Sequence, residues 1–356
     1  PKTTSSRFKN QMIAIFLYVI IVHGNDNLSK ISSNQESRKS QIISQITNFE
    51  KSAERITENS KQNKAFKPDG IQPEGATGNS VALDIKQVGP DAFFCRFQTE
   101  CIFIIGNGTI QYPVDASITS LPIIILEGIT SISQYAFSNY LCPSIEIPST
   151  VTTISSQAFY NCPYLKNITV SSANSHFKSI DGILYSYSGN YLYYFPQNSD
   201  FTSYSIPSTV HTIADYSFFK SANLKTVFIP SSVTSISVYA FTECTRLQSI
   251  QVSTSNRNYK SLGGVLYSYN LATLLKYPSM KSDSYYSIPS GVRTINFNAF
   301  ENCTYLTQLE LPSSISSIQS GSFSQTGLKV VMADAQSSYF KSNESVLFSS
   351  DGQRLI

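Results

Sequence analysis

A repeated unit limits what this chain can fold into more than any other feature of its sequence. Ile229–Val252 follows the pattern I-P-x-x-V-x-x-I-x-x-x-A-F-x-x-C-x-x-L-x-x-I-x-V, which recurs at Ile147–Val170, Ile206–Ile229 and Ile288–Leu311 and, more weakly, at Leu311–Ala333. Successive copies of its proline, from Pro148 to Pro312, are 59, 23, 59 and 23 residues apart, and its phenylalanines keep the same spacing. Such a repeat predicts a solenoid, in which each coil is completed by its neighbours.

Each part of the unit has a physical role in such a coil. Leu247, Ile250 and Val252 have the spacing of a short strand, which would pair in parallel with the strand of the next coil. The proline that follows cannot donate to this ladder and would turn the chain out of the sheet. The next apolar residues would return across the far side, so we expect the repeat phenylalanines to line up in one interior column: Phe159, Phe218, Phe241, Phe300 and Phe323.

The longer of the two steps contains an extra segment, and this segment is itself repeated. Residues 174–185 align with 258–267, and a third copy begins at Tyr339. In the first copy, Ser188-Gly189-Asn190 separates two runs rich in Tyr, Leu and Phe, which is typical of a β-hairpin. The third copy stops at Ile356 within its hairpin, so we expect a truncated array, with any membrane anchor beyond the last residue.

The part of the chain before Val81 lacks the repeat. Residues 1–24 have the order of a secretory signal peptide, with basic residues, the apolar run Ile13–Val22 and a small-residue site at Gly24. This run is shorter than the roughly 20 residues that cross a bilayer, and its alternative is a buried helix. Residues 25–80 are polar, with one helical seam that would form a stalk, a mobile amphipathic helix or a cap on the first coil: Ile42, Ile46, Phe49, Ala53 and Ile56.

The repeat array occupies residues 81–356. Ile85–Phe93 and Ile129–Phe137 match the repeat core in degraded form, as expected for the end of a solenoid, where one face must meet water. The net charge of the chain is +3 and only 14% of its residues are charged. No strong electric field therefore directs it to nucleic acid or to an acidic membrane.

The sequence contains no constellation that indicates an enzyme, a metal site or a cofactor. His23, His176 and His211 lie far apart, and Asp181-Gly182 indicates a hairpin turn rather than a calcium loop. The motifs of serine hydrolases, zinc peptidases, phosphate loops and paired cysteines are missing from the sequence. We therefore predict no catalytic, cofactor-binding or metal-binding residue.

Cysteines and sequons give two further expectations. Cys162, Cys244 and Cys303 share one position in coils too far apart for a disulfide, so we interpret them as small buried side chains. Cys95 and Cys101, in the first coils, are candidates for a disulfide in an oxidising compartment. If the chain is secreted by a eukaryote, glycosylation is expected at five N-x-S/T sequons: Asn27, Asn107, Asn167, Asn302 and Asn343.

The repeat unit and the segments between its copies resemble a known family. Together with Asp181-Gly-Ile-Leu-Tyr185 and Leu192-Tyr-Tyr-Phe-Pro196, the pattern is similar to that of BspA-like leucine-rich repeat proteins. The resemblance covers about residues 81–356. It implies a leucine-rich repeat solenoid with β-hairpin inserts and a secreted or cell-surface adhesin that binds host matrix or cell-surface proteins.

The x positions of each L-x-x-I-x-V strand would face outward and offer a surface to a protein partner. Phe228 is a large aromatic among polar neighbours there, and exposed tyrosine suits protein recognition. The alternative is that the hairpin tyrosines only cover the core. The candidate partner-binding residues are Lys166, Lys225, Phe228, Gln248, Gln251 and Gln308 on the strands and Tyr185, Tyr187, Tyr191, Tyr267 and Tyr269 in the hairpins.

Two other functions fit the same sequence. The array could be a structural or receptor spacer that self-associates through the seam between Ile42 and Ile56. It could also be an intracellular scaffold, if the segment that ends at Gly24 is not a signal peptide.

Overall fold

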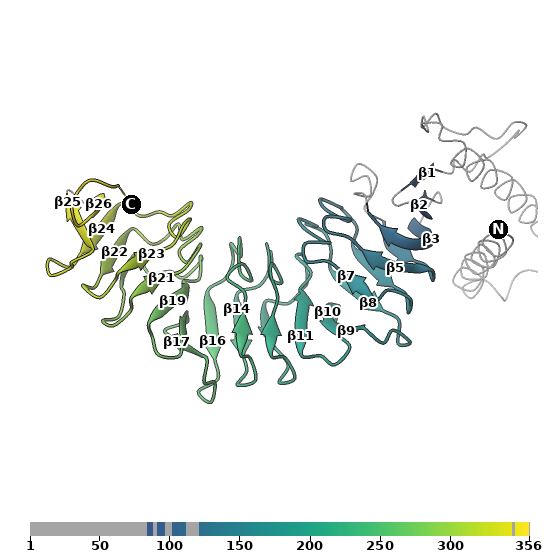
Figure 1. Ribbon diagram of the computed structural model, residues 1–356, viewed down its shortest axis with the longest axis horizontal. Coiled ribbons are helices and arrows are strands. Elements are labelled where there is room, and N and C mark those ends of the chain that lie inside the picture. The colour runs from purple at the N-terminus through teal and green to yellow at the C-terminus, as the bar shows by residue number, and fades with distance from the viewer. Residues whose placement is uncertain (1–83, 88–90, 97–101, 112–120, 344–345, 356) are drawn as a thin grey trace, which may run out of the picture.

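A computed structural model describes residues 84–87, 91–96, 102–111, 121–343 and 346–355. Within these ranges all regular structure is β, and the chain winds into coils that follow one arc (Figure 1). The expected parallel solenoid is confirmed. The expected signal peptide, the helical seam and Asn27 lie outside the described residues.

The array opens with three antiparallel strands rather than with a degraded repeat. β1 (Asp84–Gln87) pairs with β2 (Asp91–Arg96), and β2 pairs with β3 (Ile102–Ile110). Ala92 and Phe93 therefore lie in a strand, so their assignment to a repeat core was wrong. The long β3 then templates both sides of the first coil, because Ile102 pairs in parallel with Ile123 and Gly108 with Ile129.

The L-x-x-I-x-V segments form the first row of parallel strands. Ile145 faces Ile168 across neighbouring coils, Val227 faces Ile250 and Leu309 faces Val331, so apolar side chains stack inward in register. The strands of this row are β4 (Ile123–Ile125), β6 (Ser144–Ile147), β8 (Asn167–Val170), β12 (Ser203–Ser205), β14 (Thr226–Ile229), β16 (Ser249–Val252), β20 (Tyr285–Ser287), β22 (Gln308–Leu311) and β24 (Val330–Ala333).

The segments after each proline form a second row on the opposite side of the coil. Most of these strands have only two residues, but they also pair in parallel, with Ile132 facing Ile154 and Ile213 facing Ile236. The row comprises β5 (Ile129–Ile132), β7 (Thr153–Ile154), β13 (Thr212–Ile213), β15 (Ser235–Ile236), β21 (Thr294–Ile295) and β23 (Ser317–Ile318).

The first two extra segments are antiparallel inserts whose last strand joins the second row. In the first insert, β9 (Phe177–Ile180), β10 (Ile183–Ser186) and β11 (Tyr191–Tyr194) form a meander, and β11 then pairs in parallel with β13. Asp181 and Gly182 form its first turn, both at positive φ, as the sequence predicts. The second insert repeats this with β17 (Tyr259–Leu262), β18 (Val265–Ser268) and β19 (Thr273–Lys276), and the third begins with β25 (Phe340–Asn343) and β26 (Val346–Ser349).

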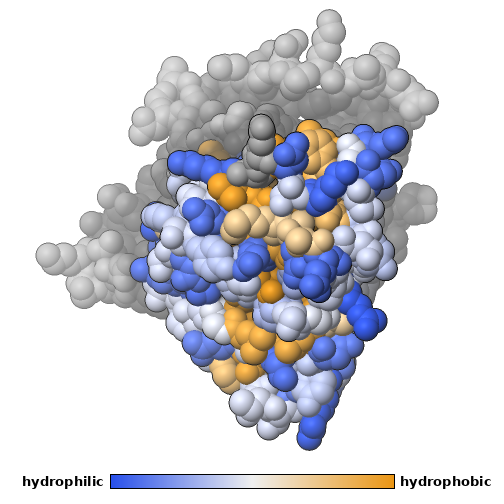
Figure 2. Space-filling view, turned by 90° about the vertical axis from the view of Figure 1, so that its left-hand side faces the viewer, coloured by the Kyte–Doolittle hydropathy of each residue, from blue (hydrophilic) through white to orange (hydrophobic). Residues whose placement is uncertain are grey.

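The inserts act as partitions between three hydrophobic cores. Leu184 of β10 packs into the core before the first insert, whereas Ile183 and Tyr185 pack into the core after it. In β18, Leu266 packs into the core before the second insert and Val265 into the core after it. In the third insert, Val346 of β26 stands where Ile183 stands in the first, and it is 42% exposed. This is the end of the array that Figure 2 shows, where a band of apolar side chains lies between polar flanks.

The aromatic column is present within each core but interrupted at the inserts. Phe218 stacks on Phe241 with 5.1 Å between ring centroids, and Phe300 lies 5.8 Å from Phe323. Phe159 instead meets Tyr194 of the first insert, and Phe195, the next residue, meets Phe218. The expectation of one column through all five rings was therefore wrong. The stacking it predicts holds between neighbouring coils of the same core, whereas rings of the first insert stand between Phe159 and Phe218.

A buried asparagine fixes the entry to each of the first two inserts. Asn174 donates to the carbonyls of Pro148 and Val151 at 2.8 and 2.9 Å and accepts the amide of Phe177 at 2.8 Å. Asn256 makes the same bonds to Pro230, Val233 and Tyr259. Because a buried amide side chain must be fully paired, this residue ties the insert to the preceding coil. The sequence signal that could have found it is the recurrence of asparagine at the same place in both inserts.

We predict that Phe241→Ala lowers the free energy of unfolding by ~3–5 kcal/mol, because it leaves a cavity beside Phe218 in a core that neighbouring coils share. Urea denaturation followed by far-ultraviolet circular dichroism measures the change. Val238→Ala in the same coil is the control, since Val238 is 48% exposed and should change stability by less than about 0.5 kcal/mol. Equal effects of the two variants would contradict the shared core.

Candidate functional site

The outward face of the first row carries the side chains that the sequence places there. Lys166, Gln248, Gln251 and Gln308 are exposed, as is Lys225. Phe228 is 38% exposed, with Ser205 and Gln251 beside it on the neighbouring strands. The face is therefore mostly polar, with Phe228 near the middle of the arc, where β14 lies in Figure 1. Tyr285 of β20 and Met332 of β24 are further exposed apolar side chains of the same row.

The hairpin tyrosines divide into buried and exposed members. Tyr185 and Tyr267 are fully buried, so the expectation that they offer a contact surface was wrong. They lie on the side of β10 and β18 that faces the following core, and each hydroxyl hydrogen-bonds the hydroxyl of another tyrosine, Tyr204 or Tyr286. Burial raises the pKa of both far above the usual range.

Tyr187 and Tyr269 point away from the core. Their exposed fractions are 56% and 39%, and they occupy equivalent places just after β10 and β18. Tyr191 is half-buried. The exposed pair remains available for contact with a partner.

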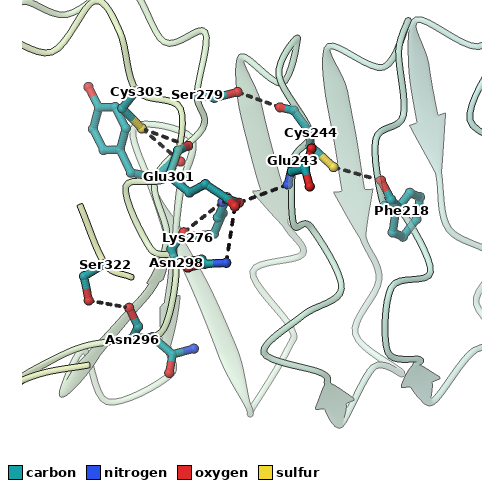
Figure 3. A network of polar contacts seen from close by, with 11 residues as sticks. Phe218, Glu243, Cys244, Lys276, Ser279, Asn296, Asn298, Glu301, Cys303 and Ser322 are labelled. Carbon is teal, nitrogen blue, oxygen red and sulfur yellow. Dashed lines mark hydrogen bonds and ion pairs between the residues drawn. The ribbon is translucent and has the colours of Figure 1, made fainter. Parts of the chain in front are cut away.

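A buried ion pair is the most concentrated group of charge in the described core. Lys276 Nζ lies 3.4 Å from Glu301 Oε2 and donates to the Asn298 carbonyl at 2.9 Å (Figure 3). Glu301 also accepts hydrogen bonds from the Glu243 amide and from the Asn298 side chain. Both charged groups are thus satisfied by the fold, which indicates a structural role rather than a reactive one.

The repeat cysteines are buried, as expected, and also make a contact that the sequence does not reveal. The thiols of Cys162 and Cys244 each donate to the carbonyl of the repeat phenylalanine one coil earlier, at 2.9 Å. Burial raises the pKa of Cys162, Cys244 and Cys303 to about 12. Cys142 is a further buried free thiol. The side chains of Cys95 and Cys101 lie outside the described residues, and their disulfide stays a prediction.

Other expected residues are spread along the array. His176 and His211 are exposed, Asn167 and Asn343 are exposed sequons, and Asn107 and Asn302 are half-buried. In the described part of the chain, no three His, Cys, Asp or Glu side chains cluster in a way that could hold a metal ion. Nor does that part contain a helix with the length and apolarity to cross a bilayer.

The repeats match the family model of the BspA type leucine rich repeat region, with six copies over residues 112–191, 187–279 and 280–351. The chain belongs to the BspA-type leucine-rich repeat family. The residues that carry the match are those that build the two strand rows and the partitions between cores.

Three solved structures of similar proteins come from bacteria. A leucine-rich repeat protein from Eubacterium ventriosum is 23% identical, with 72% of this chain and 73% of that one covered and a TM-score of 0.48. Pneumococcal vaccine antigen PcpA is 19% identical, with 69% of each chain covered and a TM-score of 0.44. A leucine rich cell surface protein from Faecalibacterium prausnitzii is 25% identical, with 69% and 76% covered and a TM-score of 0.38. No curated protein matches the chain.

We predict that Lys276→Met in this BspA-type array costs about 3–5 kcal/mol of stability, because it leaves the Glu301 carboxylate buried without its partner. The first insert has Tyr194 and Phe219 at the equivalent places. The double variant Lys276→Tyr, Glu301→Phe should therefore recover most of that loss. Urea denaturation compares the variants, and a double variant weaker than Lys276→Met would show that the pair is not interchangeable with aromatic packing.

We predict that the four buried thiols resist alkylation in the folded protein, because thiolate is the reactive form and burial raises their pKa. Iodoacetamide at pH 8, with and without urea, followed by peptide mass spectrometry, measures each cysteine. The unfolded thiols have a pKa of about 8.5, so their stabilising contribution is complete below that pH. It is lost as the pH rises toward about 12. Rapid labelling without urea would contradict their burial.

Proposed function

We propose that this protein is a secreted or surface-attached, non-enzymatic adhesin that binds extracellular proteins of a host or a neighbouring cell through the outward face of its first strand row. The observation that supports this most directly is the exposure of Phe228 between the polar side chains of Ser205 and Gln251 on the parallel sheet. An exposed aromatic ringed by polar side chains has the composition of a binding centre, where aromatic burial supplies affinity and the polar rim supplies specificity.

The geometry of the face suits a protein partner. The ladder holds Gln251 of β16 beside Phe228, and the exposed side chains of Lys225 and Gln248 directly precede β14 and β16. Because the backbone groups of these strands are already paired in the ladder, a partner would contact side chains rather than add a strand. Tyr187 and Tyr269 extend the contact area at the first two inserts, at equivalent positions.

Secretion and glycosylation are part of the same proposal. They rest on the signal-like order of residues 1–24 and on the sequons. Asn167 lies on the outward face of β8, two coils before β14 in the first row. A glycan there would cover one end of the face and leave Phe228 accessible.

We predict that Phe228→Ser reduces binding to immobilised extracellular matrix proteins by at least tenfold, because it removes the apolar centre of the face. The full chain is applied to a panel of matrix proteins, and bound protein is quantified by surface plasmon resonance. Tyr187→Ser should cause a smaller loss. Val238→Ser is the matched control, since Val238 is comparably exposed but lies on a turn after β15. Undiminished binding by both Phe228→Ser and Tyr187→Ser would refute the site.

A further inference from the structure

A groove opens on the second row at the first insert, away from the face discussed above. Among the described strands, β7 pairs with β5 alone and β11 pairs with β10 and β13, so no ladder joins β7 to β11. The space between them is a cavity of about 190 Å³ floored by Leu184 and Tyr194. The insert therefore leaves a recess where a regular coil would close the sheet.

Aromatic rings line this recess. Tyr160 stacks on Phe219 with 4.6 Å between centroids, Tyr216 meets the edge of Phe219 at 5.8 Å, and Tyr191 lies 4.5 Å from Tyr193. All four tyrosines are half-buried. Desolvation raises the pKa of each, so their hydroxyls remain protonated and can donate hydrogen bonds at neutral pH.

The second insert shows that the fold does not require these rings. The residues at the equivalent places there carry no aromatic side chain: Thr242, Thr273, Leu275, Asn298 and Glu301 replace Tyr160, Tyr191, Tyr193, Tyr216 and Phe219. Both inserts nevertheless have the same strands and register. The aromatic lining is therefore a property of the first recess and not of the insert.

The edge strand before the insert, β7, also differs from its counterpart β15 before the second insert. In the second insert, the hydroxyl of Tyr259 accepts the amide of Ile236 at 2.9 Å, at the edge of β15. The corresponding residues in the first insert are Ile154 and Phe177, and phenylalanine has no hydroxyl to offer. Because the Ser155 amide donates toward β5, the amide of Ile154 points the other way, into the recess that Ile154 lines. It is left for an acceptor on a bound molecule.

The chemistry of the lining selects among ligands. None of the described residues that line the recess is Lys, Arg or His. The ammonium group of Lys220 lies 5.2 Å from the centre of the Phe219 ring, but it is paired with Glu243 and donates to Asn161. The lining therefore offers no unpaired cation to a phosphate, sulfate or carboxylate group.

Three polar residues of the lining, Ser155, Ser156 and Gln157, are neutral, whereas Asp215 has a carboxylate. A matching ligand has a flat apolar face that packs against the aromatic rings. It also has hydroxyl groups that hydrogen-bond the Asp215 carboxylate, the Ile154 amide and the hydroxyls of the lining.

We propose that this recess binds one pyranose ring of a neutral glycan. The C–H bonds on one face of such a ring pack against aromatic faces, and its hydroxyls both donate and accept. The cavity is smaller than sites for drug-sized ligands, which begin at roughly 300 Å³, and this fits one sugar residue with the rest of the glycan outside. A peptide segment would need apolar pockets at alternate residues, whereas the recess is a single hollow.

The test uses the full chain expressed in a bacterium, where it carries no eukaryotic N-glycans of its own. A printed array of neutral, sialylated and sulfated oligosaccharides is the probe, and bound neutral glycans are then measured by calorimetry. We expect binding to neutral glycans and at least a tenfold loss in Tyr191→Thr, Tyr193→Leu, which installs the residues of the second insert. Tyr216→Asn should weaken binding in the same way.

Two controls separate this site from a fold defect and from the sheet face. Thermal unfolding should be close to wild type for the double variant, because the second insert folds with the same residues. Phe228→Ser, on the sheet face, should bind glycans as wild type does. Binding of no neutral glycan, binding of acidic glycans only, or equal binding by the folded double variant would overturn the proposal.

Discussion

The structure depends on the burial of apolar side chains between coils that cannot bury them alone. A coil here has two short strands, some of only two residues, and a single layer of Ile, Val, Leu and Phe inside it. Isolated strands of this length are unstable in water. Parallel pairing with the next coil satisfies the backbone and covers the open side of the apolar layer. The stability of each coil thus depends on its contacts with the coils next to it, as in other repeat arrays.

The inserts solve a different problem within the same constraint. Alternate residues of β10 and β18 face opposite ways, so one strand closes one core and opens the next. This places Tyr185 and Tyr267 in the interior, although they belong to what the sequence presents as projecting hairpins. It also breaks the second row at the first insert, and the recess beside Tyr191 follows from that break. The first insert therefore both separates two cores and creates the recess.

Much of this architecture could be predicted from the sequence, because each coil repeats the same physical requirements. The outward positions around Phe228, the burial of the repeat cysteines and the turn at Asp181-Gly182 all follow from local periodicity. The burial of Tyr185 and Tyr267 could not, because strand alternation does not reveal that both sides of an insert strand face a core. The start of the array also misled prediction, because Ala92-Phe93 copies the repeat letters within an antiparallel strand.

The partitions have a consequence for how the molecule responds to force. Each of the three cores is closed by its own insert, and among the described strands no parallel ladder runs from the coils of one core to those of the next. When such an array is pulled from its ends, as between two adhering cells, the cores can give way one after another. A stretched molecule would lengthen in discrete steps while its remaining cores stay folded.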